Sequence, residues 1–185
     1  AAYDWLEASF ETDWRRDLVG EVEVGYVTTA VGGREWQFEL GGRVNLGRHF
    51  VGRLSAGYRD QRDDAQWMTN RADEQQGIGG VAHVFGQLDR QTVDVTLRTS
   101  YLVDRDLSCE LYLQPFLAVG DYARPRYLAA PDTRDLRPYD LDAAAFDFRN
   151  SALNANLVLR WQYRPGSTVF LVYTHGRYLF EERRG

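Results

Sequence analysis

The chain has no lysine, one cysteine and one methionine, and it has no long run of apolar residues. The lone Cys109 has no second cysteine to pair with, so the cysteine content does not indicate a redox compartment. A helix that crosses a bilayer needs about 20 consecutive apolar residues. With a mean hydropathy of -0.48 and no such run, the sequence excludes an α-helical membrane protein. It leaves open a membrane β-barrel, in which every second residue faces the lumen.

Positive charge is carried by arginine alone and is outweighed by acid. The 22 basic residues stand against 27 acidic ones, which gives a formal net charge of -5. A surface that binds nucleic acid normally gathers positive charge, so we expect no nucleic-acid partner. The absence of lysine is what a genome rich in G and C produces, although the planar fork of arginine also suits paired, dehydrated sites.

Apolar and polar residues alternate with a period of two through most of the chain, which is the pattern of β-strands. In residues 35–46, for example, Trp36, Phe38 and Leu40 alternate with Glu35, Gln37 and Glu39. The pattern predicts about nine strands, at residues 3–13, 18–29, 35–47, 50–61, 76–88, 91–103, 107–120, 150–164 and 167–179. We therefore expect residues 1–185 to form a single all-β domain or barrel segment, an antiparallel up-and-down sheet.

The predicted strands are long and their connections are mostly tight. Strands of soluble domains usually have about 5 to 6 residues, whereas about 10 residues tilted near 45° cross a bilayer. Most of the predicted strands reach that crossing length. Turn chemistry occurs at Gly32-Gly33, Gly47-Arg48, Asp89-Arg90, Asp104-Arg105-Asp106 and Pro165-Gly166. Two connections are predicted to be long polar loops, near residues 61–75 and 121–149.

Alternation gives the sheet an apolar face and a charged face, and something apolar must cover the first. Each large apolar side chain removed from water contributes about 1.5 to 3 kcal/mol. In a membrane barrel the apolar face meets lipid, and in a soluble sheet it meets protein. Long strands, uncharged apolar faces and aromatic residues near strand ends favour an antiparallel transmembrane β-barrel. A soluble β-sandwich or lectin-like binding module is the alternative.

Each face has its own set of predicted residues. The charged and polar residues predicted to face the lumen are Glu21, Glu23, Glu35, Glu39, Arg43, Arg53, Arg59, Asp94, Arg98, Glu110, Gln114, Arg160 and Gln162. The residues predicted to face lipid are Trp36, Phe38, Leu40, Leu54, Leu97, Leu111, Leu113, Leu157, Leu159 and Trp161.

No catalytic constellation is visible in the sequence. His49, His83 and His175 lie far apart, and we predict no catalytic residue, no cofactor and no metal ligands. Residues 132–148 set five aspartates among aromatic residues, which would suit Ca²⁺ or a sugar, but their spacing is not that of an EF-hand. A solvated loop is the simpler interpretation. An outer-membrane hydrolase, the second alternative, would need a Ser, His and acid set that the sequence does not display.

Two stretches of the sequence resemble a known family. They are 84-VFGQLDRQTVDVTLRTSYLVDRDLSCELYLQPFLAVGDY-122 and 148-FRNSALNANLVLRWQYRPGSTVFLVYT-174. The chain resembles the C-terminal region, a domain of unknown function (5916), of bacterial surface proteins that carry an N-terminal carbohydrate-binding family 9-like module. The resemblance implies a β-barrel in the outer membrane of a Gram-negative cell. It implies no catalytic residue.

The same resemblance predicts a role for the protein and indicates which parts of the family's proteins this chain does not contain. It implies an anchor or channel of a surface protein linked to glycan binding or uptake, with outer-membrane lipid, glycans or oligosaccharides and other envelope proteins as partners. The chain lacks the family's carbohydrate-binding module and its closing strand, so we expect a fragment of a larger, even-stranded barrel. The predicted strand count puts the turn at 165–166 in the periplasm, the 121–149 loop outside, and the 61–75 loop in the periplasm.

Overall fold

The structure, a computed structural model, describes residues 2–30 and 32–182. Eight strands make up most of it, and a short ninth strand, β7 (Leu136–Pro138), and a 3-10 helix, η1 (Ala143–Phe146), lie between β6 and β8. The eight are β1 (Tyr3–Glu11), β2 (Leu18–Thr29), β3 (Arg34–Leu46), β4 (Phe50–Ala72), β5 (Val81–Leu102), β6 (Leu107–Leu128), β8 (Phe148–Arg164) and β9 (Ser167–Glu182). Within the described residues, no helical segment could span a lipid bilayer.

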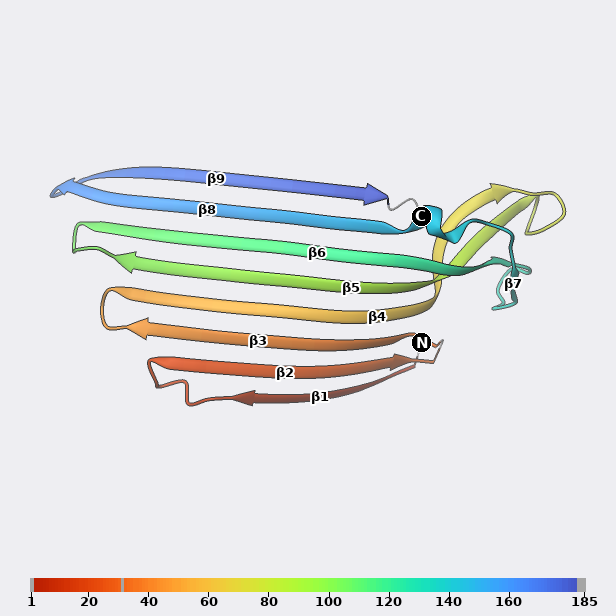
Figure 1. Cartoon of the computed structure of the whole chain (residues 1–185), viewed down its shortest axis with the longest axis horizontal. Helices are drawn as coiled ribbons and strands as arrows, with labels where there is room; N and C mark the ends of the chain where they lie inside the picture. The colour runs from red at the N-terminus through yellow and green to blue at the C-terminus, as the bar shows by residue number, and fades with distance from the viewer. Residues whose placement is uncertain (1, 31, 183–185) are drawn as a thin grey trace.

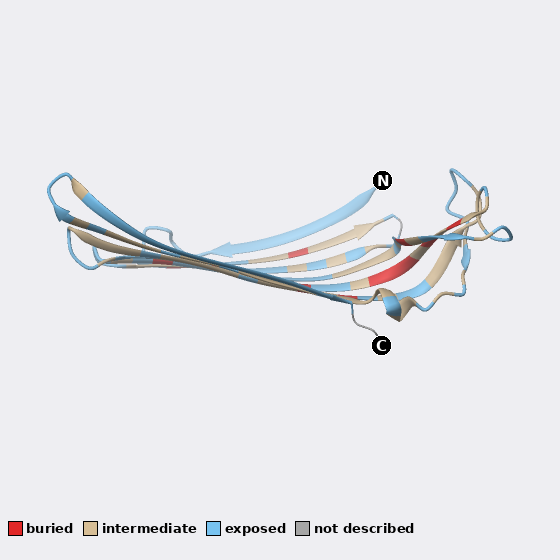
Figure 2. Ribbon diagram, turned by 90° about the horizontal axis from the view of Figure 1, so that it is seen from above, coloured by how far each residue is buried: buried red, intermediate tan, exposed pale blue. Residues whose placement is uncertain are grey.

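All nine strands belong to one antiparallel sheet, which confirms the all-β, up-and-down prediction. The order is β1-β2-β3-β4-β5-β6-β8-β9, with β7 added to the end of β6, so strands adjacent in sequence are neighbours in space (Figure 1). Figure 2 shows the sheet from its side as a single curved layer. The sheet is not closed: β1 and β9 are its two edges.

The prediction and the structure both have nine strands, but they are not the same nine: β7 lies within the expected 121–149 loop, and one predicted turn is wrong. Residues 76–88 and 91–103 were expected to be two strands joined at Asp89-Arg90, whereas the structure has one strand, β5, through this region. Asp89 lies opposite Arg62 of β4 and accepts two hydrogen bonds from its guanidinium, at 2.6 and 2.7 Å. Asp89-Arg90 is therefore part of a strand that contacts β4, and the chain does not reverse there.

One continuous β5 changes where the long connections lie. Strand β4 continues through Ala72, so residues 61–72 extend a hairpin that turns within residues 73–80, where Gly77, Gly79 and Gly80 have positive φ. This hairpin and the connection from β6 to β8 extend from the same end of the sheet, and short turns occupy the other end (Figure 1). The expected positions on opposite sides are corrected, because the predicted count contained one strand too many between them.

The buried hydrophobic cluster lies at one end of the sheet, where β4 and β5 extend beyond most of the other strands. Met68, Ala82 and Val84 of the β4–β5 extension are buried and pack against aromatic residues that include Tyr122 and Phe146. Elsewhere the layer is thin, and its accessible surface of 12958 Å² exceeds the roughly 9,100 Å² expected of a compact protein of this mass. Many large apolar side chains of the described residues are therefore exposed.

Candidate functional site

Strand pairing sorts the side chains into two faces. Residues directly opposite each other in an antiparallel sheet point to the same side, so the registers can be followed from strand to strand. All ten residues predicted to face lipid fall on one side, the apolar face, and the predicted charged and polar residues fall on the other, the polar face. Gln162 lies within a register shift between β8 and β9, so its pairing does not place it.

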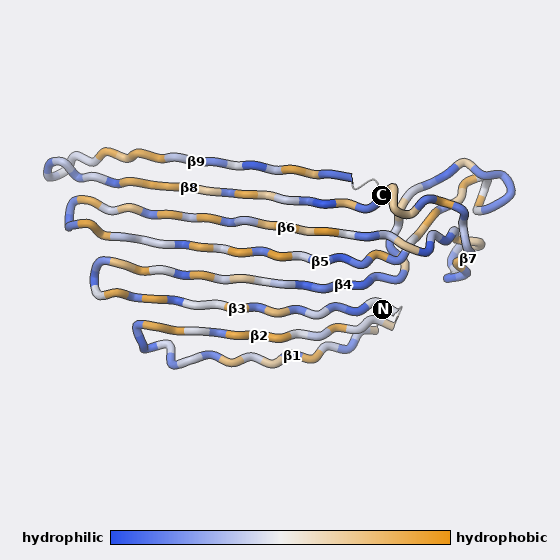
Figure 3. Tube along the Cα trace, viewed as in Figure 1, coloured by the Kyte–Doolittle hydropathy of each residue, from blue (hydrophilic) through white to orange (hydrophobic). Residues whose placement is uncertain are grey.

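The apolar face is open to solvent in this structure. Trp36 is 43% exposed, Leu40 56% and Trp161 52%, and Figure 3 shows apolar residues recurring along neighbouring strands. Aromatic rings continue across three strands: between ring centroids, Trp36 is 4.4 Å from Tyr26 of β2, and Phe38 is 6.1 Å from Trp36 and 6.3 Å from Tyr58 of β4. An apolar surface of this extent marks a contact with protein or lipid.

A charged row ends the apolar face on the side of the long connections. Arg34, Arg62 and Asp89 occupy directly opposed positions on β3, β4 and β5. The hydrogen bond from the Arg62 guanidinium holds the pKa of Asp89 below its ordinary value, and partial burial of the carboxylate works against this effect. Both side chains remain about 40% exposed, at 36% and 44%. The row therefore lies beyond the apolar residues, where water is accessible.

Carboxylates gather on the polar face near β2, β3 and β5. Glu23 lies directly opposite Glu39. The Glu21 side chain crosses over Gly41, where a Cβ would collide with it, and Asp94 crosses over Gly57 in the same way, at 2.9 Å from a Cβ placed there. Glycine at these two positions lets acidic side chains lie across neighbouring strands.

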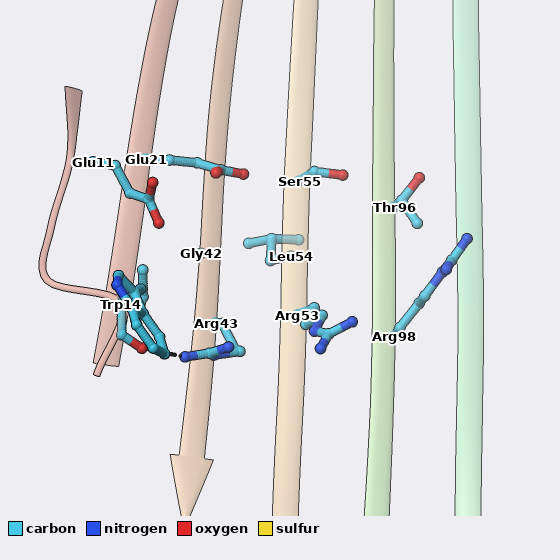
Figure 4. A pocket seen from close by; sticks show the side chains of 11 residues that line it. Glu11, Trp14, Glu21, Gly42, Arg43, Arg53, Leu54, Ser55, Thr96 and Arg98 are labelled. Atoms are coloured by element: carbon cyan, nitrogen blue, oxygen red, sulfur yellow. Dashed lines mark hydrogen bonds between the residues drawn. The ribbon is translucent and has the colours of Figure 1, made fainter. Parts of the chain in front are cut away.

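Three arginines form the next feature of the polar face. Arg43, Arg53 and Arg98 are directly opposed on β3, β4 and β5. With Glu11, Glu21 and other residues they line a hollow of about 430 Å³. Figure 4 shows the two carboxylates toward one end of the hollow and Arg43 and Arg53 toward the other.

Six residues of the hollow were absent from the predicted sets: Glu11, Trp14, Val19, Gly42, Ser55 and Thr96. Glu11 continues the β1 alternation of Glu7 and Ser9, and Ser55 and Thr96 follow the period of two from Arg53 and Arg98. The alternation therefore contained the signal for these three. Trp14 lies in the turn between β1 and β2, outside any period, and only the fold brings it to Arg43.

The remaining polar candidates are engaged in local contacts. His49 Nδ1 lies 2.9 Å from the carbonyl oxygen of Leu102, and His83 Nδ1 lies 2.8 Å from Asn70 Oδ1. In the aspartate-rich segment, Asp142 caps η1 and Asp147 accepts a 2.6 Å hydrogen bond from the Tyr122 amide. Within residues 2–30 and 32–182, no three acidic, histidine or cysteine side chains are grouped as metal ligands.

Comparison with known proteins gives one result that covers nearly the whole chain. No curated protein and no solved structure matches the sequence significantly. A family model described as "Domain of unknown function (DUF5916)" matches residues 2–183. Because the match extends through all the strands described above, the chain belongs to the DUF5916 family.

Proposed function

We propose that this sheet is part of a transmembrane β-barrel in the outer membrane of a Gram-negative cell, with its apolar face against lipid and its polar face lining the lumen. The barrel serves as the anchor or channel of a surface protein linked to glycan binding or uptake. Its partners are outer-membrane lipid, glycans or oligosaccharides, and other envelope proteins.

The uncovered apolar face carries this proposal. Its side chains form a continuous surface over eight strands, from Leu6 on β1 to Tyr173 on β9, and both ends of that surface are exposed. Covering such a face contributes about 25 cal/mol for each Å² of apolar surface removed from water. Lipid tails supply that cover without a second sheet, and a band flanked by aromatic residues is typical of outer-membrane barrels.

The apolar side chains of the apolar face form a band that runs across the strands, here called the apolar band. The slope of this band relative to the strands agrees with strands that are tilted in a bilayer. On the apolar face of β1 the consecutive apolar side chains are Leu6, Ala8 and Phe10, and on that of β9 they are Val169, Leu171 and Tyr173. Strand β3 serves as the reference for comparing the two edges. When the paired residues are followed from strand to strand, Leu6 is level with Trp36 of β3, and Tyr173 is level with Val44 of β3. The band thus shifts by about eight residues, or about 26 Å at 3.3 Å per residue, over seven strand spacings of about 4.8 Å. This corresponds to a tilt of about 38°, within the roughly 35–45° of membrane barrels.

The experiment is tryptophan quenching in lipid vesicles. Variants of the full-length protein that retain only Trp36 or only Trp161 are refolded into vesicles with and without acyl chains brominated along their length. Both tryptophans lie on the apolar face, so both should be quenched by the brominated chains. A matched variant that retains only Trp67, in the β4–β5 extension and on the far side of the charged row, should be quenched much less.

Absence of quenching would favour a soluble protein over the barrel. If neither Trp36 nor Trp161 is quenched and the protein is a folded monomer in buffer without detergent, the apolar face is covered by protein. A soluble β-sandwich or lectin-like binding module would then replace the barrel. Hydrolysis of an ester, peptide or glycan by the intact protein would instead favour an outer-membrane hydrolase.

A further inference from the structure

We infer that the hollow on the polar face is a binding site for small hydroxylated anions, the class that includes acidic sugars, with the anionic group on Arg43, Arg53 and Arg98 and the hydroxyl groups on Glu11 and Glu21. The inference deepens the proposed function, because it specifies which solutes a glycan-linked lumen would hold. It rests on the proposed function for the position of this face in a lumen.

The arginines are directly opposed, and among the described residues none of the three is joined to a carboxylate in an ion pair. Like charges facing each other across strands destabilise a sheet. In the part of the chain that the structure describes, none of the three forms an ion pair: the ion pairs found there join Arg62 to Asp89, Arg105 to Asp106 and Arg137 to Asp135. A bound anion would offset the repulsion among the three guanidinium groups.

Other contacts hold two of these arginines in place. Arg43 donates from Nη2 to the carbonyl oxygen of Trp14 at 2.6 Å, and its Nε is buried with no hydrogen-bond partner. The Arg98 guanidinium lies over the ring of Tyr112, 5.2 Å from its centroid. A carbonyl and an aromatic face orient a guanidinium without neutralising it, so both arginines keep donors for an acceptor such as carboxylate or sulfate.

The opposite end of the hollow suits hydroxyl groups. Ionised carboxylates only accept hydrogen bonds, so Glu11 and Glu21 would bind sugar hydroxyls and repel a second anionic group. Ser55 and Thr96 lie in the same lining and add hydroxyls that both donate and accept. The volume of about 430 Å³ lies in the range of small-molecule sites. The arrangement therefore favours a solute with one anionic end and one hydroxylated end.

The position of the arginines along their strands distinguishes this site from a charge patch at the end of the sheet. On β4, Arg53 lies between Gly52 and Leu54, and both of these residues pair within the apolar rows. The arginines therefore lie at the height of the apolar band and away from its edges. A solute that passes through the proposed lumen would meet them along its path.

Calorimetric titration of the full-length protein in detergent micelles at low salt tests the site. Glucuronate should bind at least tenfold more tightly than glucose, and Arg53→Gln should weaken glucuronate binding at least tenfold. Arg59→Gln is the matched control, since Arg59 is on the same strand and face but lies opposite Gln37 and Thr92. It should leave the affinity within about twofold. Glu21→Gln should weaken glucuronate binding but not sulfate binding.

Equal affinity for glucose and glucuronate would overturn the inference, and so would equal losses in Arg53→Gln and Arg59→Gln, which would indicate a diffuse field. If Arg53→Gln does not fold by circular dichroism, Arg98→Gln takes its place with the same expected loss. The measurement needs no bilayer. Selective binding without quenching of Trp36 and Trp161 would therefore keep the site and reject the lumen, whereas quenching without selective binding would keep the barrel and reject the site.

Discussion

At the scale of single residues, the side of the sheet decides what each side chain tolerates. Leu157 lies opposite Leu111 and Tyr173 in the middle of the apolar band on β8. Asn154, three residues earlier, lies opposite Gln114 and Gly176 on the polar face. The two positions share a strand and differ in the medium that the proposal assigns to them.

Leu157→Arg should destabilise the folded protein in vesicles by about 2 to 4 kcal/mol, the cost of arginine facing lipid near the bilayer midplane. Asn154→Arg should change the free energy of unfolding by less than about 1 kcal/mol, because its side chain would reach water in the lumen. Urea titration in vesicles measures both. Equal tolerance at the two positions would contradict the assignment of the faces.

The ion pair of Arg62 and Asp89 contributes to stability in a way that depends on pH. Asp89→Asn should lower the free energy of unfolding by less than about 1 kcal/mol, because both partners are partly exposed and ion pairs of this kind are weak. The folded pKa of Asp89 is lowered by Arg62. Its contribution is therefore complete above the ordinary carboxyl pKa, near pH 4, and is lost as the pH falls through the lowered value.

Urea unfolding in micelles at pH 7 and at pH 2 measures this contribution. The difference between the wild-type protein and Asp89→Asn should shrink at the lower pH. Arg105→Gln is the control for loss of an exposed charge, because the Arg105 side chain is 93% exposed in its pair with Asp106. A difference that grows with acid would contradict the proposed cause.

At the scale of elements, the extension of β4 and β5 behaves differently from the sheet that carries it. It contains the buried cluster of Met68, Ala82 and Val84, whereas most residues of the strands beyond it are exposed or half-buried. Packing between side chains therefore stabilises the extension, whereas in the proposed barrel lipid stabilises the rest of the sheet. The two parts should respond independently to mutation.

Val84→Ala should loosen the extension by about 2 kcal/mol, from about 0.8 kcal/mol for each buried CH₂ group plus the cavity left behind. Hydrogen exchange should show faster exchange of amides in residues 66–72 and 81–86, with little change in β8. Val172→Ala, on exposed β9, is the control and should leave the extension protected. Uniform acceleration over all strands would contradict the independence of the two parts.

At the scale of the whole molecule, the position of the long connections fixes sidedness. The β4–β5 turn and the β6–β8 connection lie at one end, and the turns at 47–49 and 103–106 lie at the other (Figure 1). Long loops of outer-membrane barrels are extracellular and short turns are periplasmic. In the proposed barrel, both long connections therefore lie outside the cell.

Single cysteines in a Cys109→Ser background test this sidedness in intact cells. Gln76→Cys and Asp132→Cys, one in each long connection, should react with a membrane-impermeant maleimide. Arg48→Cys and Arg105→Cys, in the short turns, should react only after the outer membrane is opened. Labelling of Gln76→Cys and Asp132→Cys from opposite sides would contradict the single, continuous β5.

Alternation along the chain was enough to predict most of the strands and their two faces, because a period of two places alternate side chains on opposite sides whatever the neighbours are. Trp36 and Glu39 could therefore be assigned to opposite faces before any strand was paired. Which strands pair, and where a strand ends, could not be predicted from the alternation. Asp89-Arg90 has the composition of a turn, and only its contact with Arg62 reveals a strand.

Strand pairing in the folded structure sets every property that depends on register. It brought Arg43, Arg53 and Arg98 into one row, although 10 and 45 positions separate them in the sequence, and it placed Trp14 beside them. It also set both long connections at one end and gave the apolar band its slope. These properties follow from which residues lie opposite each other, and hydrogen bonds between distant segments fix that relation while local periodicity does not.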